Sequence, residues 1–133
     1  MAETLKLELV APERLLLSQQ VEMVIVPGTE GYFGVLPKHA PVISTLRPGV
    51  IDVYEGGAIS QRVFVTGGFA EVNAAGVTVL VDEALPASDV TKEMAAARKA
   101  AAEDAAASAT TDDARRRAAA ALKVAEAMAA LAA

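Results

Sequence analysis

The sequence predicts an all-β sandwich or flattened barrel over residues 1–86, followed by an antiparallel two-helix hairpin over residues 87–133. The main observation is a change of composition at Pro86, because all nine Gly, all six Pro and all five aromatic residues lie at or before it. Gly and Pro mark turns, and β-branched and aromatic residues favour strands. About half of the later residues are Ala, the strongest helix former.

Short strands are predicted in the first part from the alternation of apolar and polar residues, which has a period of two in a half-buried strand. Turn signals such as Pro27–Gly28 and Gly56–Gly57 separate them. The predicted strands are residues 5–9, 21–26, 50–54, 61–66, 69–73 and 77–82. Strands of this length and spacing are typical of a small sandwich or flattened barrel.

Two helices are predicted in the second part. Ser88 or Asp89 can cap the first helix, and Thr110 with Asp113 has the spacing of a capping box for the second. The short link between the helices favours an antiparallel hairpin. The residues expected on the apolar stripes are Val90, Met94, Ala97 and Ala101 in the first helix and Leu122, Ala125, Met128 and Leu131 in the second.

The hairpin should form readily and hold its neighbours weakly, because an alanine side chain has little apolar area to bury. We therefore expect a mobile hairpin that can detach from the β domain and dock elsewhere.

The acidic charge belongs entirely to the first part. Residues 1–86 carry 5 basic and 10 acidic side chains, a net charge of −5, and residues 87–133 carry 7 of each. This charge disfavours binding to nucleic acid and to an anionic membrane surface. The sequence shows neither a signal peptide nor a run of apolar residues long enough to span a bilayer, so we expect no direct membrane insertion.

The chain's only histidine, His39, lies in the Gly- and Pro-bracketed stretch EGYFGVLPKHAPVISTLRPG, residues 30–49, which we expect to be a loop. The histidine could be a catalytic base, a metal ligand or part of a surface that another protein recognises. A base would need a nucleophile or an orienting carboxylate, and Lys38, Ser44 and Thr45 stand in no recognised arrangement. One histidine without any cysteine cannot build a multi-histidine or thiolate metal site. We therefore predict no catalytic, cofactor or metal residue.

Three consecutive arginines, Arg115, Arg116 and Arg117, are the strongest basic feature. They either pair with Asp112 and Asp113 on a solvated helix face or contact an acidic surface of a partner. The sequence leaves both interpretations open.

The segments GYFGVLPKHAPVISTLRPG, VTGGFAEV and VTVLVDEA together resemble the ε-subunit family of the rotary proton-translocating ATP synthases, whose mitochondrial members are called δ. That family's G-x-x-G-[IV]-L-P-x-H-A-P…L-x-P-G segment is matched from Gly31 to Gly49, and its GG-F/I-x-E-V element from Gly67 to Val72. The resemblance covers essentially the whole chain.

The resemblance implies a non-catalytic rotor subunit of the central stalk, which couples the γ subunit to the membrane c-ring at the cytoplasmic face of the bacterial inner membrane. By position in the motif, the c-ring contacts would be Glu30, Gly31 and Tyr32, and the γ contacts would be His39, Val42 and Ile43. Tyr32 stands where the family often has an acidic or polar residue, so the c-ring contact should be more apolar here.

In many bacterial members of the family the helical hairpin also extends toward the catalytic α and β subunits and restrains ATP hydrolysis. Arg115, Arg116 and Arg117 would then be a regulatory contact with an acidic β-subunit segment. Some members bind ATP through a Leu/Ile-Asp-x-x-Arg-Ala motif at the start of the first helix. Here Thr91 and Met94 replace the Asp and the Arg, so we expect no tight ATP binding and no other cofactor.

An alternative hypothesis is an adaptor or ligand-binding β-sandwich whose helices self-associate. It fits the composition of the two parts but not the motif.

Overall fold

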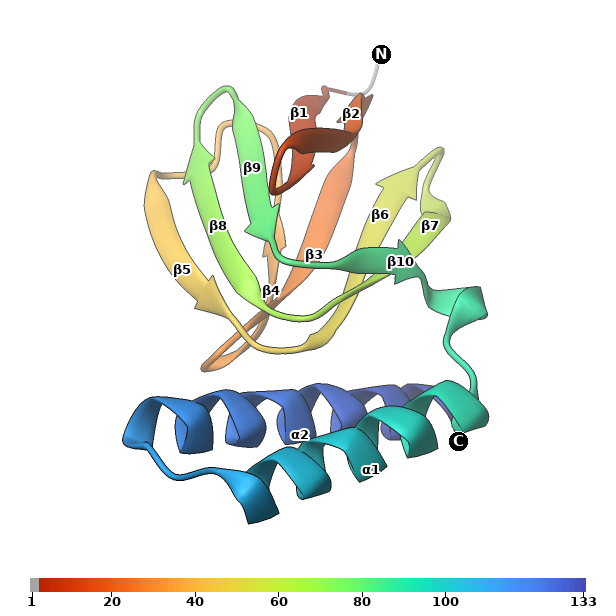
Figure 1. Ribbon diagram of the computed structural model, residues 1–133. Helices are drawn as coiled ribbons and strands as arrows, with labels where there is room; N and C mark the ends of the chain where they lie inside the picture. The colour runs from red at the N-terminus through yellow and green to blue at the C-terminus, as the bar shows by residue number, and fades with distance from the viewer. Residues whose placement is uncertain (1–2) are drawn as a thin grey trace. The chain divides into compact units, whose positions relative to one another are not determined.

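The computed structural model describes residues 3–133. The chain forms two compact units, and the boundary between them in the sequence lies between Pro86 and Ala87. The first unit is all β, and the second consists of helices (Figure 1). The predicted fold class is therefore confirmed.

The first unit is one curled sheet of ten strands (Figure 1). The strands are β1 Leu5–Ala11, β2 Arg14–Val21, β3 Met23–Gly28, β4 Gly31–Val35, β5 Val42–Leu46, β6 Gly49–Glu55, β7 Ala58–Val65, β8 Gly68–Asn73, β9 Gly76–Val81 and β10 Ala84–Pro86. Their hydrogen-bonded order is β10-β7-β6-β3-β5-β8-β9-β1-β2, and β4 pairs with β3. The pairing of β1 with β9 is parallel, and the other pairs are antiparallel.

Alternation along the strands places the core on one face of the sheet. The inward residues of β1 are Leu5, Leu7 and Leu9, each at most 3% exposed, and those of β9 are Val77, Val79 and Val81. Leu16, Leu17, Phe33 and Val63 are partly buried against this core. Burial of such side chains is the main term that stabilises a small sheet.

Four strands lie outside the predicted set, namely β2, β4, β5 and β10. In β2 three consecutive leucines hide the period-two pattern, because a bulge opposite Leu9 and Val10 leaves Leu16 as an extra residue. The expectation of a loop over residues 30–49 is wrong for most of its length, because β4 and β5 occupy it and only residues 36–41 connect them. The glycines of β4 are tolerated because β4 pairs with β3 alone.

The second unit contains a short 3₁₀ turn, η1 Ala87–Asp89, and two helices, α1 Lys92–Ser108 and α2 Asp112–Ala132, which lie antiparallel beside each other (Figure 1). Both helices begin at a threonine. The Thr91 side chain accepts a hydrogen bond from the Met94 backbone N–H at 3.1 Å, and the Thr111 side chain accepts one from Ala114 at 3.0 Å. The predicted caps are therefore wrong: η1 takes up Ser88 and Asp89, and the second cap is one residue after Thr110.

The apolar stripe of α1 also differs from the prediction. Ala95 and Ala102 are buried, whereas Ala97 and Ala101 are exposed. An almost uniform run of alanines fits several stripes equally well, so its phase cannot be derived from the sequence. In α2, where larger side chains mark the phase, Ala125 and Met128 are buried as predicted, and Leu122 and Leu131 are half-buried. Neither helix of the described residues has a stretch long and apolar enough to cross a membrane.

Candidate partner-binding site

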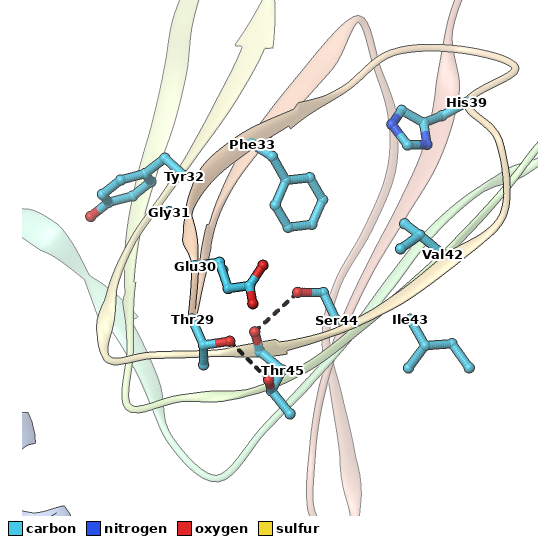
Figure 2. A pocket seen from close by; sticks show the side chains of 11 residues that line it. Thr29, Glu30, Gly31, Tyr32, Phe33, His39, Val42, Ile43, Ser44 and Thr45 are labelled. Atoms are coloured by element: carbon cyan, nitrogen blue, oxygen red, sulfur yellow. Dashed lines mark hydrogen bonds between the residues drawn. The ribbon is translucent and has the colours of Figure 1, made fainter.

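The residues that the motif assigns to partner contacts line one open hollow of about 580 Å³ in the first unit (Figure 2). The hollow lies between the tip of the β3–β4 hairpin and strand β5. Its lining comes from residues 28–33, His39 and residues 42–45. Glu30, Gly31 and Tyr32 are thus on one side of the same hollow that has His39, Val42 and Ile43 on the other.

The tip of the β3–β4 hairpin is held in place by hydrogen bonds to β5. Gly28 pairs with Gly31, so Thr29 and Glu30 form the turn, two residues later than the turn signal at Pro27–Gly28 suggests. The Thr29 backbone N–H donates to the Thr45 carbonyl at 3.0 Å, and the hydroxyls of the two threonines lie 3.0 Å apart (Figure 2). These bonds fix the position of Glu30 relative to β5.

Side chains of the hairpin point in two directions. The Phe33 ring and the Glu30 carboxylate face the middle of the hollow, whereas the Tyr32 ring points away from it (Figure 2). The Arg47 guanidinium carbon lies 4.7 Å from the centroid of the Tyr32 ring. Close packing behind Tyr32 requires glycine at position 49, because a Cβ there would lie 2.9 Å from Pro27 Cβ and 3.0 Å from the tyrosine hydroxyl.

The loop of residues 36–41 presents His39 at the rim. It begins with a tight turn in which the His39 backbone N–H donates to the Leu36 carbonyl at 3.2 Å. Pro37 and Lys38 are the central residues, and Lys38 has a φ of 64°, as the third position of a type II turn demands. The His39 Nδ1 donates to the Ala40 carbonyl at 2.7 Å, so the ring is held by its own loop.

The serine and threonine hydroxyls that line the hollow form hydrogen bonds within the protein. The Ser44 hydroxyl donates to the Thr45 carbonyl at 3.1 Å, and the Thr29 and Thr45 hydroxyls bond to each other. Across residues 3–133, no three His, Cys, Asp or Glu side chains are grouped so that they could hold a metal ion. The hollow therefore presents a carboxylate, an imidazole and exposed apolar side chains around a hydrogen-bonded backbone.

The three arginines belong to the second unit, in the first turns of α2. Arg115 pairs with Asp112 at 2.8 Å, and Arg116 and Arg117 pair with Asp113 at 3.6 and 2.9 Å. All five side chains are exposed, so each ion pair contributes little to stability. The aspartates also favour the positive end of the helix dipole, where arginines alone would be unfavourable.

Sequence reasoning missed a set of exposed apolar side chains elsewhere on the sheet, above all Leu15, Phe69 and Leu80. A signal for two of them exists. In β8 and β9, Phe69 and Leu80 occupy the phase of the alternation that Glu71 and Thr78 share, which is the phase that faces solvent.

Comparisons with known proteins agree with each other. A model of the family described as "ATP synthase, Delta/Epsilon chain, beta-sandwich domain" matches residues 4–87. The chain is 54% identical to the ATP synthase epsilon chain of Paramagnetospirillum magneticum over 133 residues, which are 100% of both proteins. It is 58% identical to that of Rhodospirillum rubrum over 93 residues, which are 70% of this chain and 69% of that protein.

Solved structures show the same fold. A chain in a cryo-EM structure of Euglena gracilis mitochondrial ATP synthase, OSCP/F1/c-ring in rotational state 1, is similar with a TM-score of 0.76 and 28% identity, covering 96% of this chain and 80% of that one. A chain in the central stalk/c-ring structure of Tetrahymena thermophila mitochondrial ATP synthase has a TM-score of 0.56 and 16% identity, covering 66% of this chain and 70% of that one. At that identity the likeness concerns the fold alone.

Proposed function

The chain belongs to the ATP synthase delta/epsilon chain family, and from this premise we propose that it is a non-catalytic rotor subunit that couples the γ subunit to the c-ring. In this role it works at the cytoplasmic face of the bacterial inner membrane, where the complex makes ATP from the proton gradient. The alternative, an adaptor or ligand-binding β-sandwich, is not favoured, because an ATP synthase epsilon chain matches this chain over its full length at 54% identity.

The observation that carries the proposal is the hollow beside β5. A coupling subunit has to hold two partners in a fixed relation, and here the two sets of motif residues are carried by strands that hydrogen bonds tie together. The bond from Thr29 to Thr45 links the hairpin tip directly to β5. Torque applied to one side of the hollow would therefore be transmitted to the other through backbone rather than through flexible side chains.

Within this proposal the two sides have different partners. Glu30, Gly31 and Tyr32, at and beside the hairpin tip, contact the polar loops of the c-ring. His39, Val42 and Ile43 contact γ, and Ile43, which is 74% exposed, is the most exposed of the large apolar side chains of the described residues. An apolar side chain so exposed is a natural contact for a protein partner.

Two variants separate these contacts. In complexes depleted of this chain and reconstituted with it, Ile43→Asp should weaken binding to γ, because it places a charge in an apolar contact. Glu30→Ala should leave γ binding intact and reduce ATP-driven proton pumping. Ile59→Asp is the control, since Ile59 is also exposed, at 44%, but lies on β7. A wild-type chain that neither binds γ nor restores pumping would overturn the proposal.

We also propose that the helical hairpin is mobile and regulates ATP hydrolysis, with Arg115, Arg116 and Arg117 in contact with an acidic segment of the catalytic subunits. Alanine accounts for four of the six buried residues of the two helices, which supports a weak hold on any neighbour. Removal of residues 87–133 should raise the hydrolysis rate of the complex, and the triple Arg→Gln variant should do the same. Unchanged rates in both would exclude this role.

Tight ATP binding by the hairpin is not part of the proposed function. Thr91 serves as the N-terminal cap of α1, and Met94 offers no cation to a phosphate. Calorimetry of the whole chain with ATP should show no binding at micromolar concentrations.

A further inference from the structure

The outer half of the β3–β4 hairpin extends beyond its pairing with β6. Among the described residues, β3 pairs with β6 only from Met23 to Ile25, and β4 pairs with β3 alone. Residues 26–33 are therefore paired mainly with each other. Glu30 and Tyr32 lie in this outer half, so the position of the proposed c-ring contact depends on what holds it.

Three consecutive residues, which end β5 and follow it, hold the outer half of the hairpin. The Thr45 carbonyl accepts a hydrogen bond from the Thr29 backbone N–H at 3.0 Å, and the hydroxyls of the two threonines lie 3.0 Å apart (Figure 2). The Arg47 backbone N–H donates to the Pro27 carbonyl at 2.9 Å. We call residues 45–47 the clasp.

The Arg47 side chain adds a second side-chain contact to the hairpin. Its guanidinium carbon lies 4.7 Å from the centroid of the Tyr32 ring, which points away from the hollow (Figure 2). Arg47 forms no ion pair within residues 3–133, so no carboxylate of these residues competes with the ring for its cation. The clasp thus contacts the hairpin at Thr29, beside the hollow, and at Tyr32, which is directed away from it.

The clasp itself is fixed in the sheet. Its middle residue, Leu46, is 5% exposed and belongs to the core. β5 pairs with β8 along residues 42–46. Ile43, a proposed γ contact, lies on the same strand two residues before Thr45. The clasp therefore connects the strand that carries the proposed γ contact to the hairpin that carries the proposed c-ring contact.

The contacts of the clasp are exposed and individually weak. Thr29, Thr45, Arg47 and Tyr32 are all exposed side chains. A single hydrogen bond or cation–π contact at such a site makes a small net contribution to stability. Loss of one contact should therefore favour local opening of the outer half of the hairpin and leave the β unit folded.

We propose that Thr45 and Arg47 are positioning residues for rotor coupling, which act through Thr29 and Tyr32 rather than by contact with γ or the c-ring. The clasp makes the hairpin tip move with β5 when γ turns. This inference rests on the proposed function and adds to it the residues whose loss lets ATP hydrolysis run without proton pumping.

The test uses Thr45→Val and Arg47→Ala, singly and together, in the full-length chain. Valine removes the hydroxyl and keeps a residue that favours strands. In the isolated chain, the Thr29 amide should exchange about two- to fivefold faster in each single variant, because one weak contact is lost. The double variant should exchange faster than either single variant.

Coupling is measured in complexes depleted of this chain and reconstituted with it. The readout is the ratio of ATP-driven proton pumping to ATP hydrolysis, together with binding to γ. We expect the ratio to fall in each single variant and to fall furthest in the double variant, with γ binding as in the wild type. A merely structural role would change γ binding and pumping together.

Two kinds of control accompany these variants. Thr45→Ser keeps a hydroxyl and Arg47→Lys keeps a cation, so each should restore most of the ratio. Gln19→Leu is the matched control elsewhere in the β unit, because it removes a side-chain hydrogen bond of 3.2 Å between distant strands, from Gln61 of β7 to Gln19 of β2. It should pump like the wild type.

Three results would overturn the inference and leave the proposed function intact. The first is a wild-type ratio in the double variant, whether or not exchange at Thr29 is faster. The second is a lower ratio with unchanged exchange, which would make Thr45 and Arg47 direct contacts. The third is a loss of γ binding that accounts for the loss of pumping. A wild-type chain that neither binds γ nor restores pumping would overturn the proposed function as well.

Discussion

The Arg47 guanidinium lies over the Tyr32 ring, 4.7 Å from its centroid, at the end of the sheet that carries the β3–β4 hairpin. The Tyr32 ring points away from the hollow, whereas the Glu30 carboxylate faces it (Figure 2). A cation–π contact at an exposed site is worth about 0.5–1 kcal/mol. The arginine thus positions a residue of the proposed c-ring contact.

Loss of this stack is the first prediction. Tyr32→Leu should lower the free energy of unfolding by about 0.5–1 kcal/mol, because the cation loses the face of the ring. Tyr32→Phe keeps an aromatic face and should behave nearly as the wild type in urea unfolding. Equal losses in both variants would show that the hydroxyl, rather than the stack, is important.

Gly49 should not tolerate a side chain. A Cβ there would approach Pro27 Cβ to 2.9 Å in a buried environment, so Gly49→Ala should destabilise the β unit by about 1–3 kcal/mol. Gly34→Ala is the matched control, because its Cβ would meet its nearest neighbour, Met23 Sδ, at an ordinary 3.6 Å. Chemical unfolding of the two variants compares them directly, and similar midpoints would contradict the prediction.

Lys38 is held in a backbone conformation that favours glycine. Its φ is 64°, and a residue with a Cβ pays about 1 kcal/mol there. Lys38→Ala removes only the exposed ion pair between Lys38 and Glu3, whereas Lys38→Gly also relieves the backbone. We expect the glycine variant to be more stable than the alanine variant in thermal unfolding. The reverse order would mean that the loop relaxes around any side chain.

Substitution of two adjacent threonines should have different effects, because only Thr111 caps α2. Thr111→Ala should destabilise the hairpin by about 1 kcal/mol, because the Ala114 backbone N–H loses its acceptor. Thr110→Ala, one residue earlier and also exposed, should have almost no effect. Amide hydrogen exchange in the first turn of α2 measures the difference. Faster exchange in the Thr110 variant would show that Thr110 caps the helix, as the capping-box spacing suggests.

Strands with strong alternation could be predicted from the sequence because one local pattern specifies them. Leu5, Leu7 and Leu9 are buried as the period of two requires. The alanine helix is the opposite case, since Ala95 and Ala97 are chemically identical and only packing decides which one is buried. Local patterns predict an element and its phase only where the side chains differ.

The candidate site, too, could be predicted from the sequence only in part. The motif supplies Glu30 and His39 as contact residues, but their position around one hollow depends on the bond between Thr29 and Thr45, which joins distant parts of the chain. The exposed apolar side chains of Leu15 and Phe69 are harder still to predict, because only the pairing of four strands and a single bulge place them on one face of the sheet.

The parallel pairing of β1 with β9 has a consequence for the synthesis of the chain. Leu7 pairs with Val77, so β1, which finds β2 early, must wait for almost the entire β unit to leave the ribosome before it finds its second neighbour, β9. Until then its leucines have no partner on that edge, and pairings between distant residues form slowly. We therefore expect a nascent β unit that still lacks β9 to be more prone to aggregation than the completed one.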